Sequence, residues 1–245
     1  MQRSDNGILI AMEGIDGAGK TTQVALLEQF FLSAGERVKR SKEPTDGPWG
    51  QKIRQSAANG RMTWTEELHA LIQDRTEHIQ NVIQPALNDG QIVILDRYFY
   101  STIAYQGTTG GDVDALTAQM FDISLEPDVV VLIDVPPEIG LARIEHARGD
   151  KPNAFENLEN LERVRAVFQH LATTHSNVVL VDGTPPIEEV RKTILAKLLE
   201  SALVPRLSMT SGPSIDSLRS SNAPGTASRL AKLRRAAGLL TKPQK

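Results

Sequence analysis

Residues 14–22 have the composition and spacing of a loop that binds the phosphates of a nucleotide. The sequence Gly14-x-x-x-x-Gly19-Lys20-Thr21 follows an apolar run and precedes a stretch with helical spacing, which is the setting that this motif requires. Glycines allow backbone N–H groups to turn toward a β-phosphate, a lysine reaches the β and γ oxygens, and a threonine hydroxyl can hold Mg²⁺. The pattern predicts a site for ATP and Mg²⁺, with Thr21 as a metal ligand.

A second group of polar residues begins at Asp96, directly after the apolar run 91–95. The Asp96 carboxylate is expected to orient Mg²⁺ or its water ligands. Arg97 is suited to hold a second anion in line with the γ-phosphorus, because a guanidinium forms strong paired hydrogen bonds with phosphate oxygens. The alternative for Arg97 is an ion pair with Asp96 or Glu43. Together the two residues favour phosphoryl transfer to an acceptor that carries its own anionic group.

The phosphate loop alone does not identify a kinase, since GTPases and other ATPases have the same loop. The chain contains no Asn-Lys-x-Asp sequence of the kind that binds guanine, and this disfavours a GTPase. An ATPase without an acceptor is disfavoured by Arg75 and Arg97, which would have no evident anion to hold. A kinase is therefore the preferred hypothesis.

Short apolar runs alternate with segments of helical spacing, and this order places the polar groups at one edge of a sheet. The runs are typical of strands that are buried on both faces of a parallel sheet. They span residues 7–13, 91–95, 129–135 and 178–181, and residues 38–43 are a further predicted short strand that ends before Pro44. Helical spacing is clearest over 23–34 and 66–82. The order predicts an α/β fold with three layers, α/β/α, around a five-stranded parallel sheet. Because ligands of such sheets bind beyond the carboxyl ends of the strands, we expect Gly14 and Asp96 to lie close together.

Composition changes near residue 204, which predicts a domain over residues 1–204 and a separate tail over 205–245. The tail is rich in Ser, Pro and Arg, and residues 201–245 carry a net charge of +7 against −10 for residues 1–200. We expect this tail to be disordered. Residues 228–240 also have the spacing of a basic amphipathic helix, which could bind an acidic partner or a membrane surface. The sequence does not identify that partner.

The composition of the core domain disfavours several classes of function. Its acidic balance argues against a large nucleic-acid-binding face. No apolar run approaches the roughly 20 residues that a membrane-spanning helix needs. The chain has no cysteine, which excludes disulfides and thiolate metal ligands. We therefore expect a soluble, cytoplasmic protein whose core binds neither nucleic acid nor membranes.

Several motifs occur together in the order and spacing of one family. They are Glu13-Gly14-Ile15-Asp16-Gly17-Ala18-Gly19-Lys20-Thr21-Thr22-Gln23, Lys42-Glu43-Pro44, Asp74-Arg75-x-x-His78, Pro85-Ala86-Leu87, Asp96-Arg97-Tyr98 and Ser101-x-x-Ala104-Tyr105-Gln106. In these motifs the chain resembles thymidylate kinases, over about residues 7–200. The resemblance implies a P-loop NTPase fold of the nucleoside monophosphate kinase type, phosphorylation of dTMP to dTDP by Mg²⁺-ATP in dTTP biosynthesis, and a homodimer.

The resemblance also implies roles for individual residues. The implied catalytic residues are Lys20, Arg97, Asp16 and Arg148. The implied ATP site consists of Gly14, Ile15, Asp16, Gly17, Ala18, Gly19, Lys20, Thr21, Thr22 and Arg143. The implied acceptor site consists of Asp16, Lys42, Leu71, Arg75, Arg97, Ser101, Tyr105 and Gln106. Within it, Lys42 and Arg97 bind the acceptor phosphate and Arg75 faces the pyrimidine edge, while Thr21 and Asp96 are the implied metal ligands.

A mobile lid is expected over about residues 141–156, where Arg143, Arg148 and Lys151 occur. These cations would close over the transferring phosphoryl group and exclude water from it. Family members whose phosphate loop lacks an arginine, as Ile15-Asp16-Gly17-Ala18 does here, supply that charge from the lid.

Two departures from the family pattern leave alternatives open. Leu71 stands where family members usually have a phenylalanine that stacks on thymine, so base identity is in question. Asn153-Ala154-Phe155-Glu156 stands where an Asp-Arg pair is common before the hydrophobic residue and the glutamate. The first departure leaves a kinase for another pyrimidine monophosphate as an alternative. The second leaves a nucleotide-binding regulatory protein with weakened catalysis.

Overall fold

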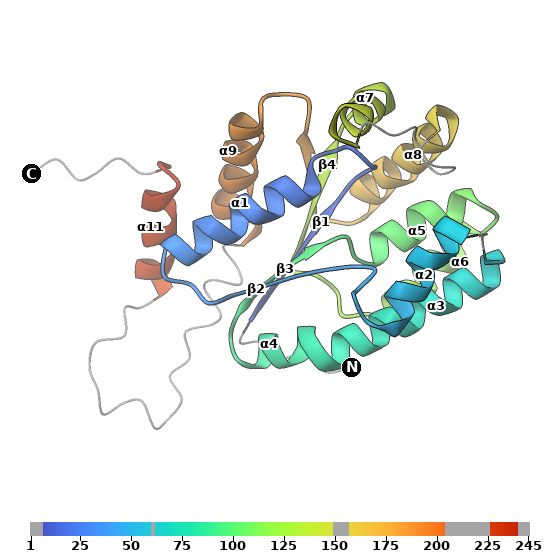
Figure 1. Cartoon of the computed structure of the whole chain (residues 1–245). Coiled ribbons are helices and arrows are strands. Elements are labelled where there is room, and N and C mark those ends of the chain that lie inside the picture. Colours follow the sequence, from blue (N-terminus) through green and yellow to red (C-terminus); the bar gives the residue numbers. More distant parts are fainter. Residues whose placement is uncertain (1–6, 60–61, 149–156, 204–225, 240–245) are drawn as a thin grey trace, which may run out of the picture.

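Five parallel strands form the sheet at the centre of the computed structural model (Figure 1). The structure describes residues 7–59, 62–148, 157–203 and 226–239. The strands are β1 (Ile8–Glu13), β2 (Val38–Lys42), β3 (Ile92–Asp96), β4 (Val129–Asp134) and β5 (Val178–Asp182). Their order across the sheet is β2-β3-β1-β4-β5, with each neighbouring pair parallel. The predicted five-stranded parallel sheet is confirmed.

The inner strands are apolar because helices cover both of their faces. Every side chain of β1 is buried, and so are nearly all of those on β3 and β4. β2 lies at an edge of the sheet, and its side chains are half-buried or exposed. Met12 at the end of β1 pairs with Asp96 at the end of β3. This register brings the loop that begins at Gly14 beside Asp96, as predicted.

Helices form a layer on each face of the sheet (Figure 1). One layer contains α1 (Lys20–Ser33), α9 (Ile187–Lys197), a π-helical turn (Leu198–Ala202) and α11 (Thr226–Ala236). The other contains α3 (Trp64–His78), α4 (Gln84–Asn88), α5 (Phe99–Thr108) and α8 (Leu158–Thr174), with α2 (Pro48–Asn59) and α6 (Val113–Ile123) packed outside them. α7 (Pro137–Arg148) follows β4 at the carboxyl edge of the sheet. In the described segments, no helix is long and apolar enough to cross a membrane.

The helix predicted over residues 66–82 is longer than expected and contains an irregular turn. It begins at Trp64, because Thr63 and Glu66 form a capping box there. A π-helical turn over Ile79–Ile83 then leads into α4. Pro85, at the start of α4, has no backbone N–H and crowds the preceding turn, which disrupts regular α-helical hydrogen bonding at this point.

The C-terminal helix α11 packs against the rest of the chain. Its apolar side chains that join the core are Leu230 and Leu233, followed beyond the helix by Ala237 and Leu239. Arg229 forms an ion pair of 2.5 Å with Glu36, just after α1. The amphipathic segment expected over residues 228–240 is thus helical over Thr226–Ala236, and its apolar face is covered by this chain itself. Residues 205–225 and 240–245 of the predicted tail lie outside the described residues.

Candidate active site

The phosphate loop connects the end of β1 to the start of α1. Gly19 caps α1 with a φ of 92°, in the left-handed region where a side chain is strained. The first N–H groups of the helix have no partner within it, and the partial positive charge at this end favours an anion. The loop lines a cavity of about 830 Å³. The predicted phosphate site is therefore open to a ligand.

Lys20 lies in this cavity wall, with its Nζ donating to the carbonyl oxygen of Ile15 at 2.7 Å. Burial, assisted by repulsion from the Arg97 cation, lowers the pKa of Lys20 to about 8, although nearby carboxylates oppose the shift. A bound phosphate adds negative charge beside the ammonium and favours its charged form. Binding of a nucleotide would therefore raise the pKa of Lys20 and keep its side chain protonated.

The two predicted metal ligands are in direct contact at the edge of the cavity. Thr21 Oγ1 donates to Asp96 Oδ2 at 2.5 Å, and both residues line the cavity. Hydroxyl and carboxylate oxygens suit Mg²⁺, which commonly takes one or two protein ligands and completes its shell with phosphates and water. Among the described residues no group of three or more His, Cys, Asp or Glu side chains could hold a metal. The donor set thus fits a Mg²⁺ ion that arrives with a nucleotide.

Arg97 lies beside the phosphate loop in an unusual backbone conformation. Its φ of 68° is in the left-handed region, which costs a residue other than glycine about 1–2 kcal/mol. The guanidinium donates to Asp16 Oδ1 at 2.6 Å and to the carbonyl oxygen of Gly14 at 3.3 Å. The ion-pair partner of Arg97 is Asp16, whereas Asp96 and Glu43 were the partners considered from the sequence.

Asp16 is held from two sides. Besides its ion pair with Arg97, it accepts a hydrogen bond from Tyr105 Oη at 2.9 Å. Burial alone would raise the pKa of Asp16, but the Arg97 and Lys20 cations outweigh that effect and lower it to about 2. The carboxylate is therefore ionised at neutral pH and fixes Arg97 and Tyr105 next to the phosphate loop.

Glu13 is a further acidic residue at this site, and the sequence analysis assigned it no role. It is the last residue of β1 and is fully buried. Its carboxylate accepts hydrogen bonds from Ser101 Oγ at 2.5 Å and from the Tyr98 backbone N–H at 2.8 Å. The sequence signal that could have identified Glu13 is an acidic residue at the end of an otherwise apolar, buried strand.

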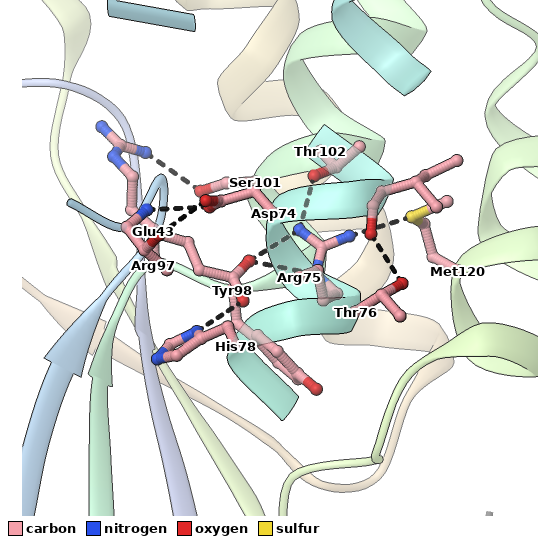
Figure 2. A network of polar contacts seen from close by, with 12 residues as sticks. Glu43, Asp74, Arg75, Thr76, His78, Arg97, Tyr98, Ser101, Thr102 and Met120 are labelled. Carbon is pink, nitrogen blue, oxygen red and sulfur yellow. Dashed lines mark hydrogen bonds and ion pairs between the residues drawn. The ribbon is translucent and has the colours of Figure 1, made fainter. Parts of the chain in front are cut away.

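Arg75 is buried in a network of polar contacts, which Figure 2 shows from close by. Its Nε and Nη2 donate to Glu43 Oε2 at 3.0 and 2.8 Å, and Nη2 also donates to Thr102 Oγ1 at 2.8 Å. Nη1 lies 3.1 Å from Met120 Sδ, and a thioether is only a weak acceptor. The Arg75 side chain is 2% exposed and does not line the cavity. A base that contacts Arg75 must therefore compete with this network, most easily at Nη1.

The same network ties α3 to the end of β2. His78 Nδ1 lies 3.0 Å from Glu43 Oε1, and His78 Nε2 lies 2.7 Å from Ser41 Oγ. Burial raises the pKa of Glu43, but the Arg75 cation and the contact with His78 outweigh it, so the net shift is downward. Glu43 is therefore an ionised anchor that holds Arg75, a role that the sequence analysis did not assign.

The other predicted acceptor residues lie at different depths. Lys42 lines the cavity and forms an exposed ion pair of 3.0 Å with Asp46. Gln106 is 2% exposed, and its Oε1 has no hydrogen-bond partner among the described residues. Such an oxygen can accept a hydrogen bond from a ligand. The predicted acceptor residues that do not line the cavity are Leu71, Arg75, Ser101, Tyr105 and Gln106.

Part of the cavity lining is a segment that the sequence analysis did not assign. It follows β5 and contributes Gly183, Thr184, Pro185, Pro186 and Ile187. Arg143 of α7, a predicted ATP ligand, also lines the cavity, and its Nη2 donates to the carbonyl oxygen of Gly183 at 2.9 Å. The position of this loop beyond a strand end was the signal that could have identified it.

The predicted lid is described only in part. Arg148 is the last residue of α7, and its side chain lies outside the described part of the chain. Lys151 and the other residues of 149–156 lie outside it as well.

Comparison with known proteins gives consistent matches over most of the chain. The family model for thymidylate kinase matches residues 12–194. A thymidylate kinase of Xanthomonas campestris pv. campestris (strain B100) is 48% identical over 202 residues, which cover 82% of this chain and 88% of that protein. One of Xanthomonas oryzae pv. oryzae (strain PXO99A) is 50% identical over 207 residues, covering 84% and 89%. One of Xylella fastidiosa (strain 9a5c) is 47% identical over 194 residues, covering 79% and 91%.

Proposed function

This chain belongs to the thymidylate kinase family, and from this premise we propose that it transfers the γ-phosphoryl group of ATP to dTMP, giving ADP and dTDP. The observation that carries the proposal is that the phosphate loop, Lys42 and Arg97 line one cavity. In-line transfer between two phosphates needs cationic and N–H groups for both of them within the same small space.

On the donor side, the phosphate loop and Lys20 hold the ATP phosphates. Lys20 exchanges its contact with the Ile15 carbonyl oxygen for the β and γ oxygens. Arg143 and the segment after β5 also line the cavity, and the rest of the nucleotide would lie against them. Thr21 and Asp96 would hold Mg²⁺, which when bound neutralises charge on the phosphate oxygens.

On the acceptor side, Arg97 and Lys42 hold the dTMP phosphate. Asp16 orients Arg97 through their 2.6 Å contact, so that the guanidinium stays at the cavity wall. The attacking phosphate oxygen is already anionic at neutral pH, and no side chain has to remove a proton from it. Catalysis is therefore positioning and charge neutralisation, without a covalent intermediate.

The residues beside the cavity bind the base of the acceptor. Arg75 and Gln106 offer polar groups for a pyrimidine edge, and Gln106 Oε1 lacks a partner among the described residues. Leu71 and Tyr105 flank the base and sugar. Arg75 contacts the base through Nη1, because the other nitrogens are bound to Glu43 and Thr102.

The lid completes the site. Arg143 already lies at the cavity, and Arg148 at the end of α7 follows it by five residues on the same helix. Closure of the lid brings these cations to the transferring phosphoryl group and keeps water out, which suppresses hydrolysis of ATP.

A second candidate function is phosphorylation of another pyrimidine monophosphate. The observation that favours it is Leu71, which gives apolar area without the aromatic face that stacks on thymine. This candidate uses the same groups for both phosphates and changes only the pocket for the base.

The test is an assay of ADP formation from Mg²⁺-ATP with dTMP, dUMP, dCMP, UMP, CMP, AMP and GMP offered separately, and with no acceptor as the control. Turnover that depends on dTMP supports the proposal. Preference for another pyrimidine supports the second candidate. ATP binding without transfer to any acceptor contradicts both and points to a nucleotide-binding regulatory protein.

The proposal includes a homodimer in the cytoplasm, as the family resemblance implies. Light scattering on the purified chain measures the mass of the particle, which for a dimer is twice the 26.8 kDa of one chain. A monomer at micromolar concentration contradicts this part without affecting the proposed reaction.

A further inference from the structure

Glu13 caps a helix that begins far away in the sequence. Its Oε1 accepts hydrogen bonds from the backbone N–H groups of Tyr98 at 2.8 Å and Ser101 at 3.3 Å, at the start of α5. Tyr98 is the N-cap residue of α5, and its own side chain makes no capping hydrogen bond. The negative carboxylate is thus placed at the positive end of the helix, where unpaired N–H groups need an acceptor.

The turn just before this helix carries Arg97, and β1 holds the turn from both sides. Arg97 donates its backbone N–H to the carbonyl oxygen of Met12 at 3.0 Å, while Glu13 binds the residues that follow. The left-handed backbone of Arg97 persists only where its surroundings fix it. Two consecutive residues of β1 provide that fixation.

A chain of hydrogen bonds continues from Glu13 to the Arg97 side chain. Ser101 Oγ donates to Glu13 Oε2 at 2.5 Å and accepts from Arg97 Nη1 at 3.0 Å; Figure 2 shows the contact between Ser101 and Arg97. The carboxylate accepts the serine hydrogen, so the lone pairs of the hydroxyl oxygen face the guanidinium. The direction of these bonds depends on a group at residue 13 that only accepts.

We propose that Glu13 is a positioning residue for the acceptor phosphate: its carboxylate orients Ser101, and through Ser101 it orients the guanidinium of Arg97. The inference deepens the proposed function and rests on it. Glu13 itself is fully buried and does not line the cavity, so it acts only through these two residues.

The energetic cost of ionising the buried Glu13 carboxyl agrees with a functional role for this residue. Burial raises its pKa to about 7, even though the Ser101 hydrogen bond, the Arg97 cation, the Tyr98 N–H and the Lys20 cation all lower it. A buried acid that is costly to ionise would be replaced by an apolar or amide side chain if stability alone mattered. Retaining it is understandable where an ionised acceptor is needed.

The test compares Glu13→Gln, Ser101→Ala and the double variant with the native enzyme at pH 8. In Glu13→Gln an NH₂ group that donates takes the place of one carboxylate oxygen, so either the Ser101 hydroxyl or the backbone N–H groups of Tyr98 and Ser101 lose their acceptor. We expect each single variant to lower kcat/KM for dTMP about tenfold, the size of one lost hydrogen bond to a charged group, with the KM for ATP changed less than about twofold. We expect kcat/KM for dTMP in the double variant to be no lower than in the less active single variant, because both changes break the same chain of contacts. Unchanged kcat/KM for dTMP in Glu13→Gln, or additive losses, would overturn the proposal.

A purely structural role for Glu13 predicts a different result. Glu13→Gln would then lower the melting temperature at pH 8 and would weaken ATP and dTMP alike, and this outcome also overturns the proposal. Asp128→Asn is the matched control, because Asp128 Oδ2 likewise accepts a backbone N–H of β1, from Leu9 at 2.7 Å, at the opposite end of the strand. The control is expected to leave kcat/KM for dTMP within about twofold.

Failure of the proposed function can be separated from failure of this inference. The native enzyme is first assayed with the panel of monophosphates, and the best acceptor replaces dTMP if another one is preferred. If no acceptor is turned over, calorimetry measures dTMP binding to the native chain and to Glu13→Gln. About tenfold weaker binding in the variant supports the positioning role without transfer, and equal binding rejects it.

Discussion

At the scale of single residues, the site depends on cations that are fixed by carboxylates. Arg97 is bound to Asp16 at 2.6 Å, and the Arg97 cation and Lys20 together lower the pKa of Asp16 to about 2. The charges of the site are therefore balanced before any substrate arrives, which limits the reorganisation needed when phosphates bind.

Removing either cation should abolish most of the activity. We expect Lys20→Ala and Arg97→Ala each to lower kcat by at least roughly a hundredfold, because phosphoryl transfer depends on neutralising and positioning the phosphates. Arg97→Ala should also raise the KM for dTMP, since Arg97 is the residue proposed to hold the acceptor phosphate. Steady-state kinetics with ATP and dTMP varied separately measures both effects. Arg37→Ala, at an exposed ion pair with Asp89, is the control, and activity retained in either test variant would refute the assigned role.

The buried charge of Glu13 makes a prediction about stability. The pKa of Glu13 rises from an ordinary value of 4.5 to about 7 in the folded protein, so the folded state holds the proton more tightly than the unfolded state. The contribution of Glu13 to the free energy of unfolding is therefore greatest below pH 4.5, and it is lost as the pH rises through 7. Glu13→Gln carries no such cost, and we expect it to be more stable than the native protein at pH 8 by up to about 3 kcal/mol, with little difference at pH 5. Thermal unfolding at both pH values measures the change, and a variant that is less stable at pH 8 contradicts it.

At the scale of elements, the phosphate loop and α7 meet backbone to backbone. A Cβ at Gly17 would lie 2.1 Å from the carbonyl oxygen of Gly140, and a Cβ at Gly140 would lie 2.6 Å from that of Asp16. Gly140 is in the first turn of α7, so the backbone of this helix lies against the loop without an intervening side chain. A displacement of α7 would therefore also displace Asp16.

Gly140→Ala should therefore impair catalysis although alanine favours helices. We expect kcat/KM for dTMP to fall by roughly ten- to a hundredfold, because overpacking of about 1–3 kcal/mol displaces Asp16 and its partner Arg97. Glu145→Ala, at an exposed position of the same helix, is the control for an added alanine. Kinetics of both variants beside their melting temperatures separates a local shift from unfolding. Activity within about twofold of native in Gly140→Ala would show that the loop tolerates the displacement.

The strands and the phosphate loop were predictable, because patterns of residues close together in the sequence encode them. The strands β1, β3, β4 and β5 follow from continuous apolar runs, and the phosphate loop follows from the spacing of Gly14, Gly19 and Lys20. The family resemblance is confirmed by the match over residues 12–194. Contacts between distant residues were not predictable, because no local pattern encodes them. Glu13 and Ser101 are 88 residues apart, and Arg75 and Glu43 are 32 apart, so neither pairing has a signature in the sequence.

At the scale of the whole molecule, the basic C-terminal helix packs on the layer that contains α1 and α9. Arg229 pairs with Glu36, and Arg234 Nε donates to the carbonyl oxygen of Leu199 at 3.0 Å. These contacts lie near the end of α1 that is opposite to Lys20. α1 has 14 residues and is therefore roughly 20 Å long. The helix α11 is thus placed to stabilise the fold without reaching the phosphates.

Disrupting this packing should lower stability and leave the chemistry unchanged. Leu233 of α11 is fully buried, and Leu233→Asp puts a charge into that contact. The free energy of unfolding can fall only by the amount that the packing of α11 contributes, because the helix can detach. We expect a loss of about 2 kcal/mol, or roughly 4–8 °C in melting temperature.

Ala236→Asp is the control, because it introduces the same side chain at an exposed position of the same helix. It is expected to change the melting temperature by less than about 2 °C. Thermal unfolding and the kcat for dTMP are measured on all three proteins. Equal melting temperatures for Leu233→Asp and Ala236→Asp would mean that the packing of α11 contributes no stability, and a lower kcat in Leu233→Asp alone would mean that the helix influences the site through α1.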